Sequence, residues 1–396
     1  MSRAILGIVF SLMTLSGSAQ GEGQIDSILL DMAQRQATES DLFFSGTFPT
    51  YRRYGRAVRG KPDNNIFFTG LVAFTLRELY PQLAPRARSV CDSILVRAYR
   101  AYPHFRNPGG RPTFNFWRQE PPLVFPHSWF LNHFNKVNQL PDDLDDTAIL
   151  WLSMQAPDSI AREVKQLMKA HANGTRGKWI RNTYRPYRKI PAYSTWFGVK
   201  MPVDFDFCVL TNVLYFVNAY GLPEDAHDSA SVELLRRMIV SGQYIRHADY
   251  ISPHYGRTPL LLYHIARLLS RFSIPALDTL KPALLQTSRT AYAAADNWLD
   301  SLVLSTAVMR LGGEPPAAPA LREEALTNHE GTSFFVASFS AIMPNLGKKL
   351  LLHSDLIKYY FTCPAYREAL YLENMILRRE SGMGARIGLR PAPGAR

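Results

Sequence analysis

Four carboxylates lie within five positions of this 396-residue chain, at Asp142, Asp143, Asp145 and Asp146, directly before the apolar run 149–152. Because neighbouring acids repel one another when ionised, at least one of them should keep its proton unless a cation neutralises the group. A carboxylic acid that keeps its proton at neutral pH can act as a general acid. The cluster is therefore the part of the sequence best suited to chemistry.

Two other interpretations of the cluster stay open. Aspartate is a favoured N-cap, and acids in a first helical turn interact well with the helix dipole, which would explain one or two of the four. Aspartate oxygens also bind Mg²⁺ or Ca²⁺. No glycine-spaced calcium loop is present, so magnesium stays an open cofactor and no residue is assigned as a metal ligand.

Helical periodicity dominates the chain around the cluster. Apolar residues recur at the i, i+3, i+4, i+7 spacing over 24–38, 64–80, 85–100, 146–156, 158–171, 206–220, 228–243, 258–271, 276–293, 296–311 and 364–378. Strand-like alternation is clear only at 332–341, where it predicts a small β-hairpin. The predicted fold class is therefore all-α.

The predicted helices differ in character along the chain. Some, such as 206–220, are apolar almost all round and should be buried, whereas others, such as 158–171, have a charged face. Six apolar helices follow short polar segments, at 62–65, 141–146, 202–206, 257–259, 296–297 and 363–364. This weak repeat of six helical hairpins predicts a single (α/α)6 toroid over residues 22–380. Its inner helices would be parallel, so that their N-termini would surround one pocket mouth.

The segment Asp143-Leu144-Asp145-Asp146-Thr147-Ala148 resembles the DxDDTA signature of the class II terpene cyclases, the squalene–hopene cyclase superfamily. Proteins of this family are α/α toroids in which the motif begins an inner helix at a cavity. The resemblance implies that Asp145 protonates an alkene or epoxide of a polyprene, an isoprenoid substrate, and that Asp143 and Asp146 support it. The QxxxGxW repeats of the squalene cyclases are absent.

Substrate-binding residues are expected in two long irregular connections, 101–141 and 173–203, and at the start of the third inner helix. Gly177-Lys178-Trp179 and Tyr193-Ser194-Thr195-Trp196 resemble further segments of the same family. Aromatic faces in these connections would stabilise a carbocation through cation–π contacts. The expected set is Trp117, Trp129, Trp179, Tyr193, Trp196, Asp204, Phe205 and Asp206.

Two other function classes remain open, so the sequence leaves it undecided whether the protein is an enzyme. An exported toroid that acts on glycans would place a carboxylate pair, for instance Asp145 and Asp204, across a cleft lined by tryptophan and tyrosine. The other class is a toroid that binds a ligand without catalysis. A closed apolar cavity beside the cluster favours terpene chemistry, an open cleft favours glycan hydrolysis, and a filled centre favours neither.

The chain ends and the charge bear on location. Residues 1–21 combine Arg3, an apolar run and small residues, which is typical of a signal peptide, so the protein is predicted to be periplasmic or secreted. Residues 381–396 are predicted to form a disordered basic tail. The net charge of +12 favours a merely solvated basic surface, and after it contact with an anionic membrane surface or a polyanionic glycan. Nucleic acid is less favoured, because an exported protein rarely meets it. The three cysteines are expected to be buried small hydrophobes, and they are Cys91, Cys208 and Cys363.

Overall fold

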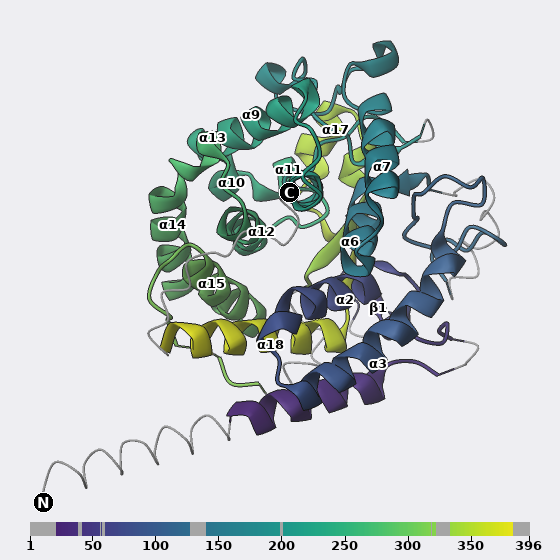
Figure 1. The fold of residues 1–396 in the computed structure, drawn as a ribbon. Helices are drawn as coiled ribbons and strands as arrows, with labels where there is room; N and C mark the ends of the chain where they lie inside the picture. The colour runs from purple at the N-terminus through teal and green to yellow at the C-terminus, as the bar shows by residue number, and fades with distance from the viewer. Residues whose placement is uncertain are drawn as a thin grey trace, which may run out of the picture.

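The computed structural model describes residues 21–38, 42–55, 57, 60–126, 140–198, 201–317, 319–321 and 333–382. Over these residues the chain is mostly helical and carries two small antiparallel sheets (Figure 1). The predicted all-α fold class is consistent with this content. The first helix of the described part covers residues 21–35.

Six long helices are buried along most of their length. They are α2 (Phe67–Leu79), α6 (Leu144–Met154), α8 (Phe207–Ala219), α12 (Thr258–Arg271), α15 (Trp298–Arg310) and α18 (Pro364–Gly382). Each of the six packs against the next one along the chain, and α18 packs against α2. The contacts therefore pass through all six helices and return to the first (Figure 1).

Besides the helix at 21–35, other long helices lie on the outside of these six in Figure 1. They are α3 (Pro85–Ala101), α7 (Asp158–Ala170), α9 (Ala226–Val240) and α14 (Lys281–Ala293). Shorter helices are α10 (Gln243–Arg246), α11 (Ala248–Ile251), α13 (Pro275–Asp278) and α17 (Asn345–Leu351). Single 3₁₀ turns occupy Tyr80–Gln82, Tyr102–Phe105, Thr175–Gly177, Arg185–Tyr187, Phe339–Ile342 and Asp355–Ile357.

The character of each helix in the sequence explains which side it buries. Helix α8 is apolar all round, and every residue from Phe207 to Val217 is buried. Helix α7 has a charged face and buries one stripe alone, formed by Ala161, Val164, Lys165 and Met168. Helices α2 and α6 approach each other closely because Gly70 has no side chain, and a Cβ there would lie 2.6 Å from Leu150 Cδ1.

The larger sheet has four strands in the order β2-β1-β6-β5, all antiparallel to their neighbours. Its strands are β1 (Tyr51–Tyr54), β2 (Lys61–Pro62), β5 (Phe335–Ser338) and β6 (Lys358–Thr362). Strand β5 confirms that 332–341 contains a strand, but the predicted local hairpin is wrong, because β5 pairs with β6 beyond α17. Alternation within one segment can predict a strand but carries no information about a distant partner. The second sheet pairs β3 (Asp142–Asp143) with β4 (Trp196–Phe197).

The starts of the long helices are joined to one another at one end of the bundle. Hydrogen bonds link α6 to the segment before α12 and link α8 to the end of α11, and an ion pair links the starts of α12 and α15. Strand β6 leads directly into α18, while β1 lies beside the segment that precedes α2. The pairs are Asp145–Tyr255, Asp206–Ser252, Arg257–Asp300 and the backbone contact Asp63–Thr50.

Several features predicted from the sequence fall outside the described residues. These are residues 1–20 of the predicted signal peptide, the side chain of Trp129, and residues 383–396 of the predicted tail. Helix α18 ends at Gly382, two residues inside the segment predicted as a tail. In the described part of the chain, none of the helices combines the length and the apolarity that crossing a bilayer requires. All three cysteines are free and buried, as predicted.

Candidate functional site

The first two acids of the cluster hold local structure together. Asp142 accepts hydrogen bonds from Asn107 Nδ2 at 2.6 Å and from the Thr113 hydroxyl, and it forms an ion pair with Arg111 at 3.3 Å. Asp143 is the N-cap of α6, because its side chain accepts a hydrogen bond of 2.8 Å from the backbone N–H of Asp146. The capping interpretation is thus confirmed for Asp143. Asp145 and Asp146 lie in the first turn of α6, where acids interact well with the helix dipole.

Asp143 and Asp146 form a buried pair of carboxyl groups. Burial raises the pKa of Asp143 to about 7, and the charges of Asp145 and Asp142 add to this effect. Burial also raises the pKa of Asp146 well above its usual range, followed by the charge of Asp143 and a hydrogen bond between the two side chains. Two carboxyl groups in such contact cannot both ionise, so the pair retains a proton at neutral pH.

Asp145 lies in the first turn of α6 and has a different environment. It accepts hydrogen bonds from the Tyr255 hydroxyl at 2.5 Å and from Asn212 Nδ2 at 2.6 Å. Burial raises the pKa of Asp145 to about 6, although both hydrogen bonds lower it. Because each oxygen already has a donor, ionised Asp145 is well satisfied, and the cluster's proton resides mainly on the Asp143–Asp146 pair.

Asn212 extends the contacts of Asp145 into the middle of the bundle. Its Oδ1 accepts a hydrogen bond of 2.5 Å from Arg267 Nη2, so the arginine charge is one bridging amide away from the carboxylate. Arg267 is buried in α12, and its Nη1 has no hydrogen-bond partner. A buried guanidinium nitrogen without a partner indicates a place for an ordered water.

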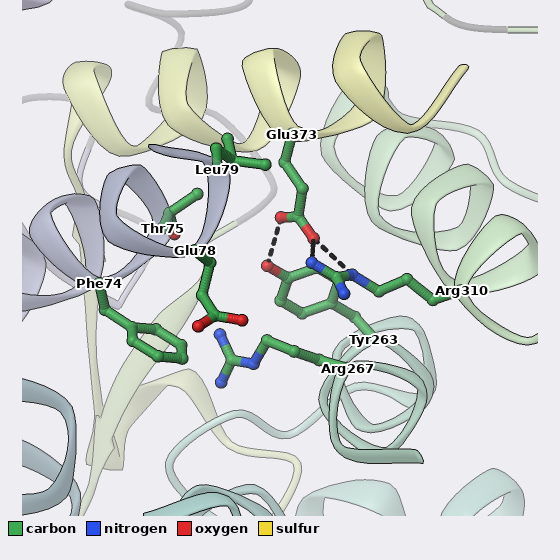
Figure 2. A pocket seen from close by; sticks show the side chains of 8 residues that line it. All are labelled: Phe74, Thr75, Glu78, Leu79, Tyr263, Arg267, Arg310 and Glu373. Atoms are coloured by element: carbon green, nitrogen blue, oxygen red, sulfur yellow. Dashed lines mark hydrogen bonds and ion pairs between the residues drawn. The ribbon is translucent and has the colours of Figure 1, made fainter. Parts of the chain in front are cut away.

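The best-formed enclosed pocket lies beside Arg267, which the contacts through Asn212 connect to Asp145 (Figure 2). It measures about 10 Å³, which is room for one water molecule. In Figure 2, Glu373 accepts hydrogen bonds from Tyr263 and Arg310, and the Glu78 carboxylate faces the Arg267 guanidinium. The pocket is too small for an organic substrate. The arrangement is a buried polar network whose remaining gap fits water.

A second polar group gathers at the start of α8. Asp206 caps this helix and accepts hydrogen bonds from the backbone N–H groups of Cys208, Val209 and His254. Asp204 is completely buried, and neither of its carboxyl oxygens has a hydrogen-bond partner. Burial raises the pKa of Asp204 to about 6, while the positive charges of Lys348 and His254 lower it.

His254 faces Asp204 without a hydrogen bond between them. The distance from His254 Nε2 to Asp204 Oδ2 is 3.9 Å, and both imidazole nitrogens lack partners. Burial lowers the pKa of His254, and the charge of Asp204 raises it. Trp196 lies beside the imidazole, with ring centres 5.8 Å apart, and its indole N–H is buried and unpartnered as well. Asp204 and His254 could exchange a proton with a small polar molecule, to which the Trp196 indole N–H could donate a hydrogen bond.

Aromatic side chains fill the space next to Tyr255, where a cavity was expected. Phe335 of β5 lies 5.7 Å from the Tyr255 ring and 4.8 Å from the Phe67 ring. Phe334 lies 5.8 Å from Tyr255 on a neighbouring side. The two best-formed pockets of the described chain lie elsewhere, one in Figure 2 and the other a surface groove of about 390 Å³ beside α9.

The structure brings only part of the expected substrate-binding set together. Trp196, Asp204 and Asp206 lie in one group, and Phe205 is buried next to them in sequence. Trp129 lies outside the described residues.

The other expected side chains have separate surroundings. Trp117 is buried and donates a hydrogen bond of 2.9 Å to Asp63 Oδ1. Tyr193 is buried and donates one of 2.8 Å to Asp228 of the outer helix α9. Trp179 is 37% exposed, and the Lys189 ammonium lies 4.2 Å from its ring centre. None of these three contacts joins its side chain to the acid cluster.

Two partners of the acids were not singled out from the sequence. Asn212 had a usable signal, because it is an amide within the apolar run 207–217 of α8. Tyr255 had none, since it lies in the connection between α11 and α12 and meets Asp145 only in three dimensions.

No arrangement for a metal ion is present in the described part of the chain, where no group of three or more His, Cys, Asp or Glu side chains could hold one. The magnesium alternative therefore stays a prediction. No protein-family model and no curated protein sequence matches this chain.

Proposed function

We propose that the protein is an (α/α)6 toroid of the class II terpene cyclase type, in which the acid cluster starts the cyclisation of a polyprene. The circuit of contacts through α2, α6, α8, α12, α15 and α18 supports the toroid. The observation that carries the chemistry is the buried carboxyl cluster at the start of α6, which holds a proton at neutral pH.

In the proposed step Asp145 first takes the proton held by the Asp143–Asp146 pair and then transfers it to a carbon–carbon double bond. The alkene π electrons form the new C–H bond, and the positive charge remains on the neighbouring carbon while Asp145 becomes a carboxylate. Tyr255 and Asn212 stabilise that carboxylate through their hydrogen bonds. The Asp143–Asp146 pair is the reservoir from which Asp145 regains a proton.

The substrate position in this proposal is the aromatic region of β5. Phe334 and Phe335 lie against Tyr255, and their faces would stabilise a carbocation. Because these rings now fill the space, a polyprene has to displace at least one of them before it reaches Asp145. A variant with a smaller side chain, Phe335→Ala, should therefore bind a polyprene more readily than the wild type.

The test is product formation from squalene and from geranylgeranyl diphosphate, measured by mass spectrometry. Asp145→Asn should reduce turnover at least about 100-fold, because it removes a general acid. Asp158→Asn, which removes an exposed acid from the first turn of α7, serves as the matched control and should keep wild-type turnover. Equal turnover in the wild type and Asp145→Asn would overturn the assignment.

A second candidate is a toroid that binds a ligand without catalysis. The observation that favours it is the aromatic packing of Phe335 between Phe67 and Tyr255, which leaves the centre filled. This candidate predicts that neither substrate yields a product, with the wild type or with Phe335→Ala. Action on glycans and export stay predictions from the sequence.

A further inference from the structure

Helix α17 exposes leucines to solvent and buries a lysine, which is the reverse of the usual pattern on a water-soluble surface. Its leucines point outward, with Leu346 71% and Leu350 74% exposed, whereas Lys348 between them is 1% exposed. Ile342, at the end of the 3₁₀ turn that precedes α17, is 47% exposed as well. Burying a lysine and exposing leucines costs free energy in water, so this surface is adapted to apolar surroundings.

Internal contacts fix this orientation. The Lys348 ammonium lies 4.6 Å from the ring centre of Tyr250, and the charges of Asp204 and Asp206 lie on its inner side. The Tyr250 hydroxyl donates a hydrogen bond to the Asn345 side chain at the first position of the helix. The inward side of α17 is thus held by polar contacts, which leaves the apolar side facing out.

Further exposed apolar side chains belong to β1 and to the segments that directly precede and follow α17. Tyr54 of β1 is 46% exposed and donates a hydrogen bond to the carbonyl oxygen of Leu356, which is 74% exposed. We call the whole set the leucine patch, and its members are Tyr54, Phe339, Ile342, Leu346, Leu350, Leu351 and Leu356. Soluble monomers rarely expose large apolar side chains in such a concentration unless the surface binds something.

The charge around the leucine patch identifies its occupant. Residues 339–360 contain one exposed lysine, Lys349, and one partly exposed lysine, Lys358, against the single acid Asp355. His353 is exposed as well and forms an ion pair with Asp249 at 2.8 Å. Leucines that project outward beside an exposed lysine fit an anionic bilayer, in which the leucines enter the acyl region and Lys349 meets the head groups. A symmetric pair of copies would instead bring the two basic borders together.

We propose that the leucine patch docks this protein on an anionic lipid surface. The proposal does not depend on the proposed catalytic function. It requires only that α17 and its neighbours enter the interface as a rigid unit. Docking there would also place β5 and β6, which flank α17 in the sequence, at the lipid surface.

The first test measures insertion at a single position. Leu346→Cys in the full chain is labelled with an environment-sensitive NBD fluorophore, and the three native cysteines are buried and so protected from the reagent. Vesicles of phosphatidylcholine containing about one third phosphatidylglycerol should raise its emission several-fold, and nitroxide lipids should quench it. The control position is Val240→Cys on α9, which is 61% exposed and lies outside the patch. Equal responses at both positions, or none at 346, would overturn the proposal.

The second test measures affinity in the full chain. Leu346→Ser/Leu350→Ser should weaken partitioning onto the same vesicles at least about tenfold, while Val240→Ser/Ile245→Ser removes two exposed apolar residues elsewhere and should leave it unchanged. Lys349→Glu should weaken binding to the anionic vesicles but not to pure phosphatidylcholine. If sedimentation instead shows a wild-type dimer that Leu346→Ser/Leu350→Ser dissociates, the occupant is a second copy and the lipid proposal fails.

Discussion

The substitution Asp145→Asn should change how the stability of the protein depends on pH. Burial raises the pKa of this carboxyl from 3.8 to about 6 in the folded protein. Below pH 3.8 both the folded and the unfolded chain carry the proton. Between pH 3.8 and about 6 only the folded chain keeps it, so the free energy of unfolding of the wild type falls as the pH rises through this window.

The size of the effect follows from the two pKa values. Each tenfold change in proton affinity corresponds to about 1.4 kcal/mol, so the fall between pH 3.8 and about 6 amounts to about 3 kcal/mol. Asparagine has no proton to lose in this range, and its contribution is constant. The free energy of unfolding of Asp145→Asn, minus that of the wild type, should therefore rise by about 3 kcal/mol from pH 3 to pH 7. The altered hydrogen bonds to Tyr255 and Asn212 add an offset that does not depend on pH.

Urea unfolding at a series of pH values, followed by circular dichroism, measures this difference directly. The control is Leu284→Ala, which removes a buried apolar side chain from α14 and should lower the free energy of unfolding by about 2–5 kcal/mol at every pH. Parallel curves for Asp145→Asn and the wild type would refute the reasoning. A difference that falls with pH would do so as well.

Three further predictions concern packing and reactivity. Asp206→Ala should lower the free energy of unfolding by about 3–5 kcal/mol, because four donors lose their acceptor, and urea midpoints will show whether it does. Gly70→Ala should lower the free energy of unfolding by about 1–3 kcal/mol, because the new Cβ would lie too close to Leu150. The control is Gly347→Ala in α17, where the new Cβ meets only an ordinary contact at 3.8 Å, and it should leave the free energy of unfolding unchanged or raise it in the same assay. Burial raises the pKa of all three cysteine thiols, which are Cys91, Cys208 and Cys363. A thiol reagent should therefore label none of them before urea unfolds the chain. Rapid labelling of the folded protein would contradict their burial.

Helix positions could be predicted from the sequence because apolar spacing and polar helix starts agreed. The expected helix 206–220 is α8 at Phe207–Ala219, and Asp206 is its N-cap. The sheet could not be assembled in the same way. Strand β5 pairs with β6 through contacts between segments more than 15 residues apart, and no local pattern encodes that register.

The acid cluster shows a similar division between local and distant effects. Capping by Asp143 follows from residue type and position alone. The difference between Asp145 and its neighbours depends on Tyr255 and Asn212, which come from other parts of the chain. The filled space beside Asp145 depends on Phe335, and nothing in the spacing of the cluster could indicate that this ring occupies it.

The most direct measurement of the central claim is turnover of a polyprene in heavy water. If the acid cluster initiates cyclisation, the first new bond is formed with a solvent-exchanged proton, and the product should contain one deuterium at the carbon that is protonated. The wild type should give this labelled product, and Asp145→Asn should not. A cyclic product without deuterium, or no product from any isoprenoid offered, would contradict the claim.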